Sequence, residues 1–237
     1  WGALKILQIN IDSNTTIGHP AVSPDEEWII FSSDMTGSSY GEQSYGGKDL
    51  WIVKKINRDQ WSDPENLGPD VNTPGDEMFP FLHQDGTLYF SSDGLVGMGG
   101  LDIYKSELSE QGKYVDPVNL KYPINSSADD FGMIIENKNE RGYFTSNRTK
   151  WIDSEGGIRN SKGGDDIYQF ELPPLLITLQ GVVIDSKTKA VIRNATVKLV
   201  NDRGEAEEFK TDNTGSYLFA VIAATIASGL VSMLHGV

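Results

Sequence analysis

An internal repeat runs through the first 172 residues and restricts the folds that this chain can adopt. One part of it is an apolar or aromatic pair, then Ser or Thr, then Ser, then Asp or Asn, in Ile30–Asp34, Tyr89–Asp93 and Tyr143–Asn147. A second part is a double glycine, any residue, Asp, Ile or Leu, and an aromatic, in Gly46–Trp51, Gly99–Tyr104 and Gly163–Tyr168. Measured from Phe31 to Phe90 to Phe144, the period is 54–59 residues. Self-similarity at such a period indicates similar supersecondary units that pack against one another.

Each repeat unit has the pattern of short strands. Alternating apolar and polar segments are separated by Gly, Pro, Asn and Asp, and the repeats have no helical stripe of useful length. In the first full unit we expect strands at about 19–23, 27–33, 48–56 and 64–68. Four short antiparallel strands at this period are typical of a β-propeller blade, whereas solenoid units are usually shorter. The predicted fold class is therefore all-β, with three visible blades of a larger closed propeller that continues before residue 1.

The repeat also resembles a known family. Pro-Asp or Asp-Gly turns, the Ser-Ser-Asp stop and the Gly-Gly-x-Asp segment are similar to the WD40-like (PD40) repeats of TolB-type propellers. They are most similar to the versions in OmpA-family envelope proteins of Bacteroidetes, some of which are associated with the type IX secretion system. The resemblance covers 1–172 and implies a periplasmic, outer-membrane-associated protein whose membrane association is indirect. Kelch repeats, which also use a double glycine, are a minor alternative for the topology.

Pro173 and Pro174 interrupt the repeat and predict a domain boundary. Three strand-like segments follow, at Ile177–Asp185, Ala195–Val200 and Thr211–Phe219. Their order resembles carboxypeptidase regulatory-like domains, which are small transthyretin-like β-sandwiches. We therefore predict an incomplete β-sandwich over 173–219, with its remaining strands missing.

The end of the chain departs from that pattern. Residues 220–237 carry no Asp, Glu, Lys or Arg and no further turn signals. The apolar stretch from Leu218 to Leu234 is at the lower limit for a membrane span and lacks a basic flank. Three interpretations stay open for this tail: an end foreign to the domain, a buried or interfacial segment, and a membrane anchor.

Composition excludes some classes of function. The chain has 20 Lys and Arg against 34 Asp and Glu, a formal net charge of −14, which disfavours nucleic acid as a partner. It has no cysteine, so disulfides, thiolate nucleophiles and cysteine-bound zinc are excluded. Its 3 histidines leave little material for a histidine-based site, and His19 occupies the repeat position of Phe79, which predicts a packing role.

Acidic residues recur once in every repeat, and this argues against a single catalytic site. Asp and Asn side chains in turns accept backbone N–H bonds, so a structural role is expected for them. No cofactor is predicted. A Ca²⁺ site is the alternative, with weak candidate ligands at Asp76, Glu77, Asp129 and Asp130.

The repeats differ in the loop between their second and third strands, which has the greatest length between Asn147 and Gly163. Insertions on a rigid scaffold are common recognition sites, and aromatic and Arg residues are enriched in interface hot spots. The predicted binding residues in these loops are Tyr40, Tyr45, Arg148, Trp151, Ile152 and Arg159. An ordinary solvated loop is the alternative interpretation.

Together these observations predict a non-enzymatic binding or scaffold module that recognises an envelope protein complex or a glycan. The family resemblance adds a cell-envelope location and a place in a secretion or motility assembly. Two alternatives stay open: a carbohydrate-active propeller enzyme that uses acidic residues, and a purely architectural spacer.

Overall fold

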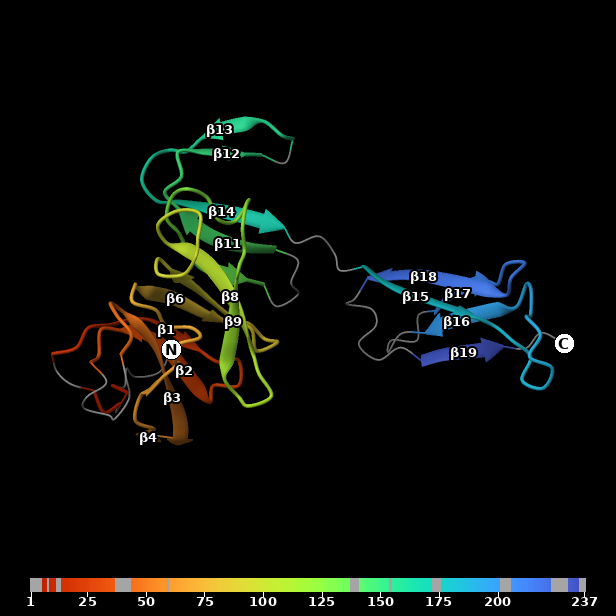
Figure 1. The fold of residues 1–237 in the computed structure, drawn as a ribbon, viewed down its shortest axis with the longest axis horizontal. Helices are drawn as coiled ribbons and strands as arrows, with labels where there is room; N and C mark the ends of the chain where they lie inside the picture. The colour runs from red at the N-terminus through yellow and green to blue at the C-terminus, as the bar shows by residue number, and fades with distance from the viewer. Residues whose placement is uncertain are drawn as a thin grey trace. The chain divides into compact units, whose positions relative to one another are not determined.

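The computed structural model describes residues 6–7, 9–11, 14–36, 44–58, 60–136, 141–153, 155–171, 176–200, 206–222 and 230–234. The chain divides into two compact units, Trp1–Glu171 and Leu172–Val237 (Figure 1). Within the described residues the secondary structure consists of β-strands and no helix, so the prediction of an all-β fold is confirmed. The boundary lies next to the proline pair that interrupts the repeat.

The first repeat forms an antiparallel sheet with the strand order β1-β2-β3-β4, in which β5 also pairs with β3. Its strands are β1 (Ile17–Val22), β2 (Trp28–Ser33), β3 (Asp49–Asn57), β4 (Gln60–Trp61) and β5 (Glu65–Asn66). The four strands expected from the sequence correspond to β1, β2, β3 and β5. The short β4 was not expected, and it pairs with the end of β3 across a register shift.

The second and third repeats form separate antiparallel sheets. The second has the order β6-β7-β8-β9, with β6 (Glu77–Leu82), β7 (Leu88–Ser92), β8 (Asp102–Leu108) and β9 (Tyr114–Asn119). The third has the order β10-β11-β14, with β10 (Asp130–Ile135), β11 (Arg141–Ser146) and β14 (Asp166–Glu171). A separate hairpin of β12 (Lys150–Ile152) and β13 (Ile158–Asn160) is inserted between β11 and β14. Each repeat of the sequence thus produces one open sheet.

The first strand of each sheet carries the same irregularity. Register shifts occur in β1, β6 and β10, and the first of the two residues inside each shift has a positive φ: 50° at His19, 54° at Phe79 and 66° at Gly132. This conformation is rare for bulky residues and is typical of a β-bulge. The rings of His19 and Phe79 stack with centroids 3.9 Å apart, and the Phe131 ring follows at 4.8 Å. The bulges therefore bring aromatic side chains of successive sheets into contact. Burial, and then the positive charge of Lys48, lower the pKa of the His19 imidazole.

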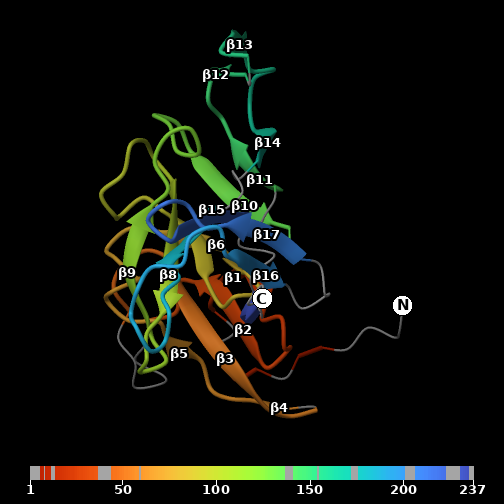
Figure 2. The ribbon, with the colours of Figure 1, turned by 90° about the vertical axis from the view of Figure 1, so that its right-hand side faces the viewer.

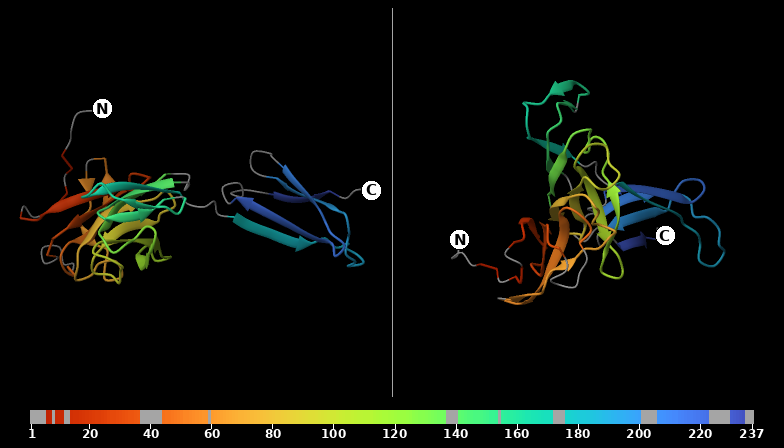
Figure 3. Two further views of the ribbon diagram at one scale, coloured as in Figure 1. Left: turned by 90° about the horizontal axis from the view of Figure 1, so that it is seen from above. Right: turned by 60° about the vertical axis from the view of Figure 1, so that its left-hand side comes forward.

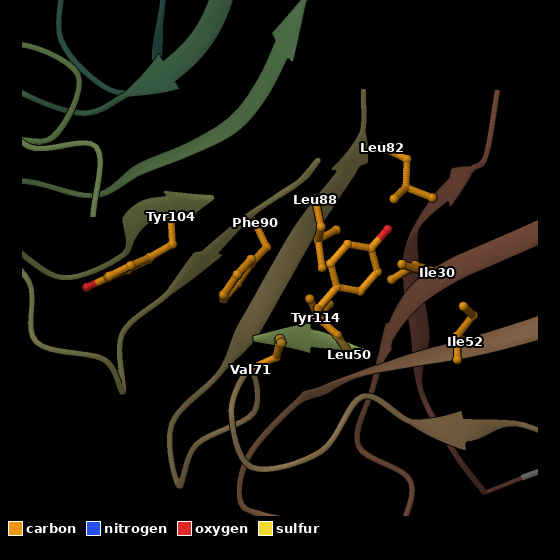
Figure 4. Close-up of a cluster of buried hydrophobic side chains, with 9 residues drawn as sticks. All are labelled: Ile30, Leu50, Ile52, Val71, Leu82, Leu88, Phe90, Tyr104 and Tyr114. Carbon is orange, nitrogen blue, oxygen red and sulfur yellow. The ribbon is translucent and has the colours of Figure 1, made fainter. Parts of the chain in front are cut away.

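Successive sheets pack face to face through apolar side chains. Between the first and second sheets, Ile30 and Leu50 lie in one cluster with Leu88, Phe90 and Tyr114 (Figure 4). Between the second and third, Ile103 contributes to a cluster whose other buried members are Met133, Ile135 and Phe144. Burial of such surfaces is the main favourable contribution to folding. The first unit is therefore held together by repeated sheet-to-sheet contacts.

The first and second sheets are each linked to the segment that follows them by one asparagine side chain. The Asn72 Oδ1 accepts a hydrogen bond from the Leu50 backbone N at 2.8 Å, and its Nδ2 donates to the Leu50 carbonyl oxygen at 3.0 Å. Asn125 makes the same two bonds to Ile103, both at 2.8 Å. Leu50 and Ile103 are buried, and unpaired backbone groups at such positions would be costly. We call each arrangement an asparagine clasp.

Glu77 is a second buried polar link between the first and second sheets. Its carboxylate accepts hydrogen bonds from the Thr73 backbone N at 2.8 Å, from Thr73 Oγ1 at 2.6 Å and from Ser92 Oγ at 2.6 Å. Its backbone carbonyl accepts a bond from Ser32 Oγ, in the first sheet, at 2.7 Å. Burial raises the pKa of the Glu77 carboxyl, although these hydrogen bonds act in the opposite direction.

The second unit has two antiparallel sheets with a shared core (Figures 1 and 3). β15 (Leu176–Val182) pairs with β18 (Ser216–Ile222), while β16 (Thr196–Val200) lies between β17 (Ala206–Lys210) and β19 (Leu230–Leu234). The buried core residues are Val183, Val197, Leu199 and Phe219.

The strands of this unit continue beyond Phe219, where none were expected. β18 extends to Ile222, and β19 completes the hydrogen bonding of the free edge of β16. The structure thus adds one strand, β19, from the apolar tail to the sandwich that was expected to end at residue 219. Among the described residues, no helix is long and apolar enough to cross a membrane.

We predict that Glu77→Gln changes the pH dependence of stability. Burial raises the folded-state pKa of the Glu77 carboxyl above its ordinary value of 4.5, so ionisation of this group opposes folding. The contribution of this carboxyl to the free energy of unfolding is therefore present at low pH and is lost as the pH rises. The free energy of unfolding of the wild type should therefore fall relative to that of the variant as the pH rises above the ordinary pKa of 4.5. Chemical denaturation at several pH values tests this.

The control is Glu110→Gln, since Glu110 is exposed in a turn. Its difference from the wild type should be flat over the same pH range. Parallel pH profiles for Glu77→Gln and the wild type would contradict the role given to this carboxylate.

Candidate binding surface

The β12–β13 hairpin is the insertion in which the sequence predicts a binding site. Its register pairs Ile152 with Ile158 and Trp151 with Arg159. Directly opposed residues lie on the same face of a two-stranded sheet, so the two isoleucines share one face. They are 53% and 72% exposed. Figures 1 and 2 show β12 and β13 beyond β14, projecting from the third sheet.

Trp151 lies on the other face of the hairpin and connects it to the third sheet. Its ring meets that of Tyr168 edge to face, with centroids 6.0 Å apart. Aromatic pairs of this geometry contribute about 0.5–1.5 kcal/mol beyond their buried area. Trp151 therefore anchors the hairpin and leaves the isoleucine face free.

The turn of the hairpin is ordered by Asp153. Its Oδ1 accepts a bond from the Gly157 backbone N at 2.7 Å, and its Oδ2 accepts one from Arg159 Nε at 2.6 Å. These bonds, first those with the Gly157 backbone and then that with Arg159, lower the pKa of the Asp153 carboxyl. Arg159 was predicted as a contact residue, and the structure places it in an exposed ion pair that stabilises the turn.

Arg148 was also expected among the loop contacts, but the structure buries it. Its side chain is 7% exposed, and its guanidinium donates to Asp130 Oδ1 at 2.5 Å and to the Pro123 carbonyl at 2.8 Å. A further bond reaches the Ile124 carbonyl, and the guanidinium lies 5.1 Å from the centre of the Tyr168 ring. The prediction of Arg148 as a surface contact is not supported. The buried Arg148 side chain packs against Tyr168, whose ring contacts Trp151.

The two tyrosines predicted as contacts are not part of the hairpin. Tyr40 lies outside the described residues. Tyr45 belongs to the loop of the first sheet, is half-buried, and donates its backbone N–H to Asp49 Oδ2 at 2.9 Å. Of the six predicted contact residues, the structure therefore brings Trp151, Ile152 and Arg159 together in one hairpin.

The four acidic residues considered as Ca²⁺ ligands have hydrogen-bond partners in the protein. Asp76 accepts a bond from the Lys48 backbone N at 2.8 Å, and Asp129 accepts one from the Leu101 backbone N at 3.0 Å. Asp130 is paired with Arg148, and Glu77 with Thr73 and Ser92, as described above. Within the described part of the chain, no group of three or more His, Cys, Asp or Glu side chains is arranged to hold a metal ion. The carboxylates of Asp76 and Asp129 accept bonds from the preceding repeat, whereas those of Glu77 and Asp130 accept bonds from their own sheet and the segment that leads into it.

Sequence reasoning missed Ile158 and Tyr168 as parts of this surface. Ile158 lies opposite Ile152 because the insertion forms a hairpin. Each strand of this hairpin is only three residues long, which is too short for an alternation of apolar and polar residues to be recognised in the sequence. Tyr168 belongs to the repeat motif, and its contacts with Trp151 and Arg148 arise from the tertiary structure.

Arg148→Ala and Arg159→Ala should differ sharply in stability. Removing Arg148 leaves the buried Asp130 carboxylate without its charged partner, so we expect a loss of about 3–5 kcal/mol in the free energy of unfolding. Arg159 pairs with Asp153 at the exposed surface, so its removal should cost much less. Chemical denaturation of both variants measures the difference, and equal losses would contradict the assignment of Arg148 as a structural residue.

In comparisons with known proteins, no family model matches this chain, and no curated protein matches it. The functional interpretation therefore depends on the residues and geometry described above.

Proposed function

We propose that the first unit consists of consecutive blades of a β-propeller and that the protein is a non-enzymatic binding or scaffold module of the cell envelope. The support for blades is the sequence repeat, the antiparallel sheet formed by each copy, and the face-to-face packing of successive sheets. The envelope location and a place in a secretion or motility assembly rest on the resemblance to the WD40-like repeats of envelope proteins.

The observation that carries the binding role is the exposed isoleucine face on an anchored hairpin. A two-stranded hairpin alone is marginally stable in water, and this one is supported by Trp151 against Tyr168 and by Arg148 beneath it. Ile152 and Ile158 lie opposite each other on that support and are largely solvent-exposed. Exposed apolar groups held rigidly are typical of interaction sites.

The chemistry of this face favours a protein partner over a glycan. Glycans are commonly recognised by open aromatic rings with polar groups around them, whereas the face here is aliphatic. The aromatic ring of the hairpin, Trp151, is partly occupied by its contact with Tyr168. An apolar patch on a partner protein would remove both isoleucines from water.

A photo-cross-linking amino acid at Ile152 tests this proposal in cells that produce the protein. The matched control is the same amino acid at Val96, which is almost fully exposed in the corresponding loop of the second repeat. We expect a discrete cross-linked protein from Ile152 that is absent from Val96. It should also be lost when Ile158→Asp is added, because the charge disrupts the apolar face without removing a buried group.

Identical cross-linking from Ile152 and Val96, or an Ile152 product that survives Ile158→Asp, would contradict the assignment of this hairpin as the binding surface. Thermal unfolding of the Ile158→Asp variant serves as the check that the hairpin substitution leaves the fold intact.

A further inference from the structure

Among the described residues, the third sheet has no counterpart of the strand that covers the outer edge of the other two sheets. In the first sheet, the outer edge of β3 is paired by β5, with Trp51 opposite Asn66. In the second, the outer edge of β8 is paired by β9, with Tyr104 opposite Asn119. The equivalent strand β14 pairs with β11, and no strand of the described residues pairs with its other edge. Exposed edges of this kind offer backbone donors and acceptors to an incoming strand.

The segments that fill this place in the first two sheets share a sequence pattern. Residues 61–73 and 114–126 both contain an aromatic residue, any residue, Asp-Pro, any residue, Asn-Leu, three further residues, Val or Ile, Asn, and Thr or Ser. The leucines of both segments donate their backbone N–H to the preceding sheet, Leu67 to the Leu50 carbonyl and Leu120 to the Ile103 carbonyl, each at 3.1 Å. The asparagine clasp, by Asn72 or Asn125, then closes on the same residue.

In the third sheet, the counterpart of the clasped residues Leu50 and Ile103 is Ile167. It occupies the repeat position of Leu50 and Ile103, which are 0% exposed, but Ile167 is 77% exposed. The neighbouring Asp166 already accepts a hydrogen bond from the Lys162 backbone N at 2.9 Å. Asp49 accepts the equivalent bond from Tyr45 and additionally takes one from Asn66 Nδ2 at 2.9 Å. The turn before β14 is thus built like those of the other two sheets. Within the described residues, however, no segment pairs with the outer edge of β14 or covers Ile167.

We propose that the outer edge of β14, together with Ile167, is a docking site for an extended peptide segment that carries the pattern shared by residues 61–73 and 114–126. The segment pairs with β14 as an additional antiparallel strand, its Leu N–H donates to the Ile167 carbonyl, and its second Asn closes a clasp on the Ile167 backbone. Its Val or Ile covers the Ile167 side chain. This site is separate from the isoleucine face of the hairpin and does not depend on the function proposed for that face.

A synthetic peptide with the sequence of residues 114–126 and a fluorescent label tests the proposal against the full chain. We expect saturable binding by fluorescence anisotropy, and binding at least about tenfold weaker when the peptide carries Asn125→Ala, because the amide clasp is lost. Hydrogen exchange should show new protection of the β14 amides on peptide addition.

Ile167→Lys in the protein should weaken binding by a similar factor, since it places a charge where the peptide buries apolar surface. Because Ile167 is exposed, this substitution should leave the fold intact. Val96→Lys is the matched control and is expected to bind the peptide like the wild type. The proposal is overturned by absence of peptide binding, by equal binding to Ile167→Lys and wild type, or by protection that appears at β8 and not at β14.

Discussion

The buried backbone of the residue that follows the repeated aspartate, Leu50 in the first sheet and Ile103 in the second, has to find hydrogen-bond partners away from water. An asparagine from the segment that leads into the next sheet supplies them, with one donor and one acceptor on the same amide. Because that segment continues directly into β6 or β10, satisfying these backbone groups also fixes where the next sheet begins. The stacking of the sheets thus uses this short-range link in addition to the apolar faces.

Two buried carboxylates, those of Glu77 and Asp130, fix the same connecting segments further along the chain. Glu77 orders the turn before β6 through Thr73, and Asp130 orders the turn before β10 through Ser126, whose backbone N donates to it at 2.6 Å. In the first case the outside partner is a serine of the neighbouring strand, Ser92, and in the second it is Arg148. The serine at the repeat position of Ser92 is kept as Ser146, but its hydroxyl accepts a bond from Arg148 Nε at 2.9 Å. The added guanidinium places a buried cation beneath Tyr168, and this is where the third repeat supports its inserted hairpin. The candidate surface is therefore a local variation of a structural device that occurs in the preceding repeat.

The strands of the first unit could largely be predicted, because alternation and turn residues are local signals. β1, β2, β3 and β5 lie close to their expected ranges. The burial of Arg148 could not be predicted, since its partners Asp130 and the Pro123 and Ile124 carbonyls are brought to it by the tertiary fold. The same holds for β19, whose pairing partner β16 is distant in sequence. The sequence did show that Asn72 and Asn125 recur, but their role as clasps required the positions of Leu50 and Ile103.

Native-state hydrogen exchange of an Asn125→Ala variant tests most directly whether the clasps hold successive sheets together. If they do, the amides of β8 and β10 should lose protection together, by about 1–3 kcal/mol in opening free energy, while those of β2 and β3 in the first sheet stay as in the wild type. Unchanged protection in β8 and β10, or a loss confined to the amide of Ile103, would show that apolar packing alone joins the sheets and would contradict this account.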